Sequence, residues 1–175
     1  MMTPDLNALF PWVLSGSRTL IGLLWLASLR WKLPPTFVAP ADHRSLLEWL
    51  QLEVAHPTVG LYGDFVAGIV LPNFTLFAWL TFLIELMIGL SLTFGIFTRL
   101  GAALGLLWSF NLALGLIAVP GEWPWSYLML IMWHALFLVS TDMQTMSLDR
   151  LRQARNNANQ PAWGFSTQGK GTRSK

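Results

Sequence analysis

The sequence predicts an all-α membrane protein, a bundle of four transmembrane helices with an amphipathic helix in its long first loop. Three observations predict this fold class. Only 11% of the 175 residues are charged, against about 25% in a typical soluble domain. Four stretches approach the roughly 20 apolar residues that a bilayer-crossing helix needs. Each stretch also carries one strongly polar side chain near its middle.

The four predicted spans cover residues 10–29, 74–97, 100–119 and 123–140. Only Thr98 and Arg99 separate the second span from the third, so these two are expected to form a tight antiparallel hairpin. Pro120 and Gly121 break the chain before the fourth span.

A single domain accounts for most of the chain. We expect a short N-terminal segment at residues 1–9 and one transmembrane domain over residues 10–155. Residues 156–175 are rich in Asn, Gln, Gly, Ser and Lys. They contain little apolar surface to bury, so a disordered basic tail is predicted there.

The outer loop, residues 30–73, contains two apolar segments. Residues 45–55 predict an amphipathic helix that either lies on the membrane surface or caps the bundle. Its expected apolar side consists of Leu46, Leu47, Leu50 and Val54. Residues 59–71 are apolar but interrupted by glycines and an aspartate, which favours a re-entrant or interfacial piece over a fifth span.

Lysine and arginine placement predicts the orientation. With four crossings, both termini share a side with the turn at residues 98–99. That side carries Arg99, Arg150, Arg152, Arg155, Lys170, Arg173 and Lys175. The opposite side carries Arg30, Lys32 and Arg44 among several acidic residues. We therefore expect a multi-pass protein of a prokaryotic plasma membrane with both termini in the cytoplasm.

The polar residues inside the four spans are Arg18, Glu85, Asn111 and His134. From the helix rise, all four are expected within roughly 5 Å of the membrane midplane. An arginine and a glutamate at matching depth predict an ion pair between Arg18 and Glu85. Ionisable groups inside a membrane normally face a partner or a cavity, so these four are the candidate binding residues.

Two interpretations of this polar cluster stay open. In one it is a structural clasp, with the ion pair and hydrogen bonds tying the helices together. In the other it binds a quinone headgroup or a small anion, with His134 and Glu85 exchanging protons. Ligation of a haem or chlorophyll metal by His134 is less favoured, because a lone histidine has no companion ligands. No metal site is predicted.

Two further patterns concern packing. Trp25, Trp108 and Trp133 lie deep in their spans, where they either pack or form a ligand-facing wall. Gly101, Gly105 and Ser109 recur every four residues, a spacing that lets helix backbones approach closely. That contact is expected either within the bundle or between copies in a homo-oligomer.

Several segments together resemble the DoxX/DoxD family of small four-helix membrane proteins. They are RTLIGLLW at residues 18–25, ELMIGLSL at 85–92, GIFTRL at 95–100 and WPWSY at 123–127. The last of these is closer to the DoxD branch, which is associated with thiosulfate:quinone oxidoreductase. In that enzyme a membrane subunit works with a second subunit to pass electrons from thiosulfate to quinone.

The resemblance implies a membrane subunit of a quinone-linked oxidoreductase, with a second protein subunit as partner. The chain has no cysteine and no recognisable cofactor motif, so a redox centre would lie on the partner or be the quinone itself. The alternative is a non-catalytic assembly subunit of a larger membrane complex. A transporter is less favoured because no pair of broken helices marks a substrate path. The net charge of +2 does not favour nucleic acid as a partner.

Overall fold

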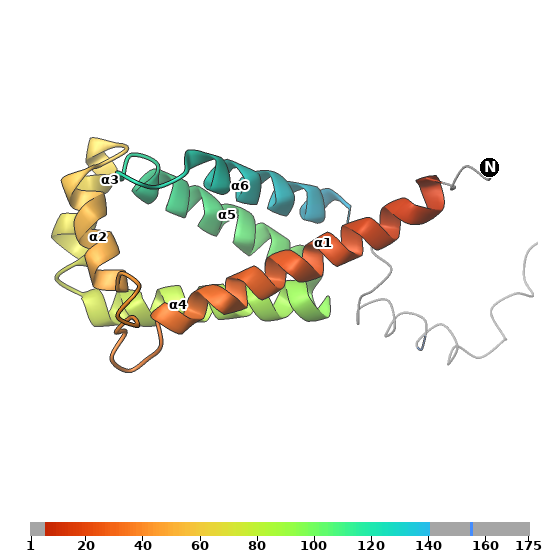
Figure 1. Cartoon of the computed structure of the whole chain (residues 1–175), viewed down its shortest axis with the longest axis horizontal. Helices are drawn as coiled ribbons and strands as arrows, with labels where there is room; N and C mark the ends of the chain where they lie inside the picture. The colour runs from red at the N-terminus through yellow and green to blue at the C-terminus, as the bar shows by residue number, and fades with distance from the viewer. Residues whose placement is uncertain (1–5, 141–154, 156–175) are drawn as a thin grey trace, which may run out of the picture.

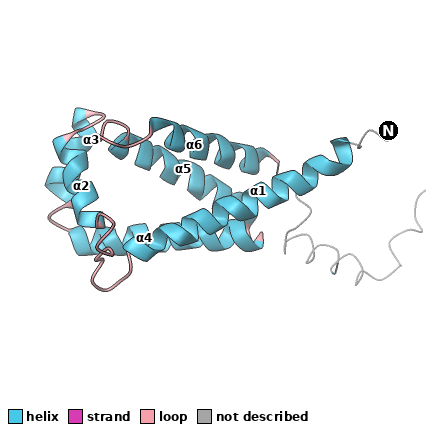
Figure 2. Cartoon of the chain, in the orientation of Figure 1, coloured by secondary structure: helices cyan, strands magenta, loops and turns pink. Residues whose placement is uncertain are grey.

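A computed structural model of the chain describes residues 6–140 and residue 155, and all regular secondary structure among them is helical (Figure 2). The three longest helices are α1 (Leu6–Ser28), α4 (Phe74–Phe94) and α5 (Thr98–Leu116). All three are long and apolar enough to cross a membrane. Helix α6 (Pro124–Val139) is equally apolar but has 16 residues. The predicted tail at residues 156–175 lies outside the described residues.

The four long helices run side by side, and the intervening segments gather at the end of the bundle away from the N-terminus (Figure 1). Helix α1 packs on α4, α4 on α5 and α5 on α6, whereas α1 and α6 contact each other only sparsely. The gathered segments are η1 (Leu29–Trp31), α2 (Leu46–Ala55), α3 (Gly60–Phe65) and the π-helical turn η2 (Val66–Val70). Since α2 contacts both η2 and α5, it caps the bundle.

Helix α1 buries one stripe of its surface against the other helices. Leu14, Arg18, Ile21 and Trp25 recur on this stripe at helical spacing and are all buried. On the same side, a Cβ on Gly22 would lie 2.5 Å from the backbone nitrogen of Thr93 in α4. The glycine therefore allows α1 and α4 to approach closely.

The predicted hairpin between the second and third spans is confirmed, but its turn lies at residues 95–97 and not at Thr98 and Arg99, which begin α5. Helix α4 ends at Phe94, α5 begins at Thr98, and the three residues between them include two with positive φ, Gly95 at 65° and Phe97 at 50°. The Ser91 hydroxyl donates to the Ile96 carbonyl at 2.7 Å, which ties the turn back onto the last turn of α4.

The predicted amphipathic helix is present as α2, but its buried side differs from the expectation. Ser45 and Glu48 form a reciprocal capping box that fixes the start of the helix. Leu46 is buried and Leu47 is 38% exposed, while Glu53 is buried at 7% exposure. Because the helix turns the Leu46 and Glu53 side toward the bundle, Leu47 does not belong to the buried face.

The predicted stripe of small residues on α5 packs inside the chain. A Cβ on Gly101 would lie 2.0 Å from the hydroxyl of Ser91 in α4, and one on Gly105 would lie 2.1 Å from the ring of His134 in α6. Ser109 is fully buried and its hydroxyl lies 3.3 Å from the same imidazole. The sequence left open whether these residues contact a helix of the same chain or a second copy. In the structure they contact α4 and α6 of the same chain.

Candidate functional site

A cavity of about 540 Å³ lies between the four long helices at the end capped by α2. This volume falls within the range of small-molecule sites in proteins. Its lining is mostly apolar and includes the indoles of Trp25, Trp31, Trp108 and Trp133. The three deep tryptophans singled out in the sequence line this cavity and also pack in the core of the bundle, so both interpretations hold in part.

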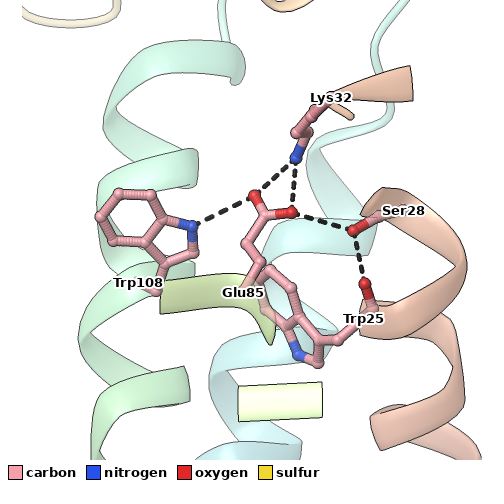
Figure 3. Close-up of polar contacts among 5 residues, drawn as sticks. All are labelled: Trp25, Ser28, Lys32, Glu85 and Trp108. Carbon is pink, nitrogen blue, oxygen red and sulfur yellow. Dashed lines mark hydrogen bonds and ion pairs between the residues drawn. The ribbon is translucent and has the colours of Figure 1, made fainter. Parts of the chain in front are cut away.

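Glu85 is the centre of the polar wall of this cavity (Figure 3). Its carboxylate lies 2.5 and 2.6 Å from the Lys32 ammonium nitrogen, and the ion pair is nearly sealed from outside, with side-chain exposures of 0% and 10%. The Ser28 hydroxyl donates to the same carboxylate at 3.0 Å, and the Trp108 indole donates at 3.3 Å. The Glu85 carboxylate of α4 therefore connects α1 and the residue after η1 with α5.

The predicted ion pair between Arg18 and Glu85 is wrong. The Arg18 guanidinium is buried and donates to the backbone carbonyl of Leu92. Leu92 lies seven residues beyond Glu85 on α4, or about 10 Å along the helix. Lys32 occupies the place expected for Arg18, because α1 and α4 run antiparallel and the residues that follow α1 are the ones beside Glu85.

His134 has both ring nitrogens engaged. The Trp25 indole donates to Nε2 at 3.1 Å, so Nε2 acts as an acceptor there. Nδ1 lies 2.6 Å from the Leu130 carbonyl oxygen, a contact that requires a proton on Nδ1. The imidazole is therefore held as a neutral tautomer, and neither nitrogen is open toward a metal. Among the described residues, no three His, Asp or Glu side chains gather as metal ligands would.

Asn111 lies at the capped end of the cavity. Its side-chain oxygen accepts a hydrogen bond of 3.2 Å from the Tyr62 hydroxyl of α3, and both residues line the cavity. Of the four predicted site residues, Glu85 and Asn111 face the cavity, whereas Arg18 and His134 lie deeper in the bundle. The four polar residues occupy successive levels along the helices and do not form one cluster.

Glu53 is a cavity residue that the sequence reasoning did not select. Its side chain descends from α2 onto the backbone of α5, where a Cβ on Gly115 would lie 2.6 Å from the carboxyl carbon. One carboxyl oxygen, Oε2, is buried and has no hydrogen-bond partner among the described residues. Burial raises the pKa of Glu53 to about 7.

The spacing of residues in the sequence contained a signal for Lys32 and for Glu53, the two cavity residues that were not predicted. Trp25, Ser28 and Lys32 follow one another at intervals of three and four, so the lysine continues the polar side of α1 beyond the end of the helix. Leu46, Leu50 and Glu53 show the same spacing on α2. Each charged residue lies on the line of residues that faces the bundle.

The charges around the cavity limit the class of ligand. Lys32 and Glu85 neutralise each other, and the remaining ionisable groups on the lining are acidic or phenolic: Glu53, Glu122, Tyr62 and Tyr127. The cavity therefore carries no surplus positive charge. Of the two ligands considered from the sequence, this favours a flat, mostly apolar molecule over a small anion.

No protein-family model matches the chain, and no curated protein or solved structure is significantly similar to it.

Proposed function

We propose that this chain is the membrane subunit of a quinone-linked oxidoreductase and that the cavity binds the quinone headgroup. The observation that carries this proposal is the cavity itself. It places aromatic walls and a few hydrogen-bonding groups together inside a bundle of apolar helices. A quinone ring is flat and apolar with two carbonyl acceptors, so stacking on indoles and a small number of donors would suffice to hold it.

The proposal treats α1, α4, α5 and α6 as four membrane spans. Helix α6 is about 24 Å long at 1.5 Å per residue, so it crosses a bilayer only with modest local thinning. Trp123 and Trp125, at its start, are 74% and 69% exposed, as expected of anchors at the headgroup level. Because the Lys32 charge is buried against Glu85, it no longer counts against a cytoplasmic location for both termini.

An opening toward lipid supports a quinone over a water-soluble ligand. The cavity lining includes Leu24 of α1 and Met129 of α6, each 54% exposed. These two residues belong to α1 and α6, which contact each other only sparsely. A ligand with a long apolar tail can then place its headgroup in the cavity while its tail stays among the lipid chains.

The electrons would come from a second subunit. The chain has no cysteine to ligate a metal cluster or relay electrons. This requirement agrees with the resemblance to the DoxD branch, in which the membrane subunit works with a partner that handles a sulfur substrate.

A matched pair of substitutions on α6 tests the proposal. Met129→Trp places a large ring at the opening, whereas Met132→Trp adds the same ring at a position that is 70% exposed and does not line the cavity. Binding of a short-chain benzoquinone to the purified protein would be followed by quenching of the cavity tryptophans. We expect Met129→Trp to weaken binding at least tenfold, which is about 1.4 kcal/mol, and Met132→Trp to leave it unchanged. Equal affinities for both variants would contradict the assignment of the cavity.

A non-catalytic assembly subunit is the second candidate. The observation in its favour is that Glu85 is fully buried and already has three donor residues, as a structural clasp requires. Quinone binding and co-purification with a membrane complex, measured on the wild-type chain, distinguish the two functions. If quinone does not bind to the wild-type chain while the chain still co-purifies with a large membrane complex, the assembly function is favoured.

A further inference from the structure

Glu53, at the capped end of the cavity, has a carboxyl oxygen without a hydrogen-bond partner among the described residues. Glu53 is 93% removed from solvent, its Oε2 atom has no partner within the described part of the chain, and the residue lines the cavity. A buried polar atom without a partner is costly in free energy. Such atoms are rare in folded proteins, and each one calls for an explanation such as an ordered water, an ion or another bound molecule.

We propose that Glu53, in its protonated form, holds the bound quinone by donating a hydrogen bond to a ring carbonyl, so that quinone binding is coupled to proton uptake. This inference rests on the proposed function and adds to it a specific residue and a dependence on pH. Quinone oxygens only accept hydrogen bonds. A carboxylic acid can donate one, whereas a carboxylate cannot.

The surroundings of Glu53 favour the protonated form. The other ionisable groups on the described lining of the cavity are the phenols of Tyr62 and Tyr127, the Glu122 carboxylate, and the neutral pair of Lys32 and Glu85. The Tyr127 hydroxyl donates to Glu122, so this second carboxylate already has a partner. No cation among these groups is left to stabilise a Glu53 carboxylate.

The position of Glu53 also suits proton exchange with water. Helix α2 lies at the end of the bundle, outside the long helices (Figure 1). Its neighbouring residues Gln51 and Ala55 are exposed. A proton taken up by Glu53 therefore needs to cross only the thickness of α2, whereas Glu85 lies behind the ion pair with Lys32.

The change of quinone affinity with pH can be calculated from the pKa of Glu53. With the pKa of Glu53 at about 7, roughly one molecule in eleven is protonated one pH unit above that value. If only this form binds, the apparent affinity falls about tenfold there, because the apparent Kd equals the intrinsic Kd divided by the binding-competent fraction. Below the pKa the affinity should level off.

The test is a titration of the full chain with a short-chain benzoquinone, followed by tryptophan quenching, on both sides of this pKa. Wild-type protein should lose about tenfold in affinity at the higher pH. Glu53→Gln keeps a neutral donor, so it should bind with nearly the wild-type affinity of the lower pH and show no pH dependence. Glu53→Leu, which has no donor, should bind weakly throughout. Asp64→Asn on α3 is the control, because Asp64 is exposed; it should keep the wild-type profile.

The outcomes separate the two proposals. A wild-type affinity that does not change with pH, or a Glu53→Gln variant that keeps the wild-type pH dependence, would overturn the role of Glu53 and leave the quinone site standing. Absence of quinone binding at every pH, with a folded protein by circular dichroism, would overturn both.

Discussion

Removing the Lys32 ammonium is the substitution whose effect follows most directly from the structure. In Lys32→Met the Glu85 carboxylate keeps only the donors Ser28 and Trp108, at 3.0 and 3.3 Å, and it has no exposure to water. Breaking a buried ion pair from one side costs about 3–5 kcal/mol, because the remaining charge is left uncompensated. At about 2–4 °C per kcal/mol for a chain of this size, the unfolding temperature should fall by about 6–20 °C.

The double variant Lys32→Met/Glu85→Gln shows whether the cost comes from the stranded charge. The glutamine oxygen can accept from the Trp108 indole, while the amide NH2 can donate to the Ser28 hydroxyl, which itself donates to the Trp25 carbonyl at 2.8 Å. No charge is left buried, so the double variant should unfold within about 1–2 kcal/mol of the wild type. Arg30→Met is the matched control, because Arg30 is the exposed cation two residues away. Its loss should cost no more than about 1 kcal/mol.

Thermal unfolding in one detergent, followed by intrinsic tryptophan fluorescence, measures all four proteins. The reasoning would be refuted if Lys32→Met were as stable as Arg30→Met, since the pair would then behave like an exposed one. It would also be refuted if the double variant were no more stable than Lys32→Met, because the cost would then lie in lost packing and not in the unpaired charge.

Two further predictions concern single positions. Gly22→Ala should destabilise the protein by about 1–3 kcal/mol, since the new Cβ would lie 2.5 Å from the backbone of Thr93. Gly16→Ala on the same helix meets nothing within 4 Å and should gain up to about 1 kcal/mol. Equal unfolding temperatures for these two variants would contradict the close approach of α1 and α4. Glu53→Gln should remove a pH-dependent loss of stability, because burial raises the pKa of Glu53 to about 7 from 4.5. Between these values the folded protein binds more protons than the unfolded chain, so stability falls as pH rises. The loss is on the order of 3 kcal/mol at 1.4 kcal/mol per pKa unit. The variant should therefore be more stable than the wild type above pH 7 but not below pH 4.5; a parallel pH dependence of both unfolding temperatures would contradict the burial of this carboxyl.

The long helices could be predicted because their signal is local. Apolar runs predict α4 and α5, and the short interruption between them leaves room only for an antiparallel hairpin, although the turn lies at residues 95–97 and α5 already begins at Thr98. Gly101, Gly105 and Ser109, which recur every four residues on α5, likewise predicted a close contact between helices. Which neighbour they contact is not a local property, and only the structure identifies α4 and α6 as the packing partners.

The partner of Glu85 could not be predicted in the same way. Matching depth along separate spans suggested Arg18, but depth does not determine which side of each helix faces the other. Lys32 follows the end of α1, and the turn at η1 brings its long side chain back beside Glu85 (Figure 3). The spacing of Trp25, Ser28 and Lys32 places the lysine on the side of α1 that faces the bundle, but the carboxylate that it contacts depends on how the helices pack together, which spacing along one segment does not encode.

Glu53 was missed for a related reason. Its helix was predicted, and the leucine-rich side was assumed to bury only apolar residues. The cap at the end of the bundle instead covers a cavity, so the buried side of α2 includes a carboxyl group. Polar residues are buried where a ligand site interrupts the packed core, which a hydrophobic pattern alone does not reveal.

We propose that a quinone headgroup occupies the cavity between α1, α4, α5 and α6. The most direct measurement is photolabelling of the chain in membranes with an azido-benzoquinone, followed by mass spectrometry of the labelled peptides. Label on Trp25, Trp108 or Trp133, reduced by an excess of unlabelled quinone, is the predicted result. Label confined to residues on the outer surface, such as Trp79 or Trp125, and unaffected by competitor would contradict the claim.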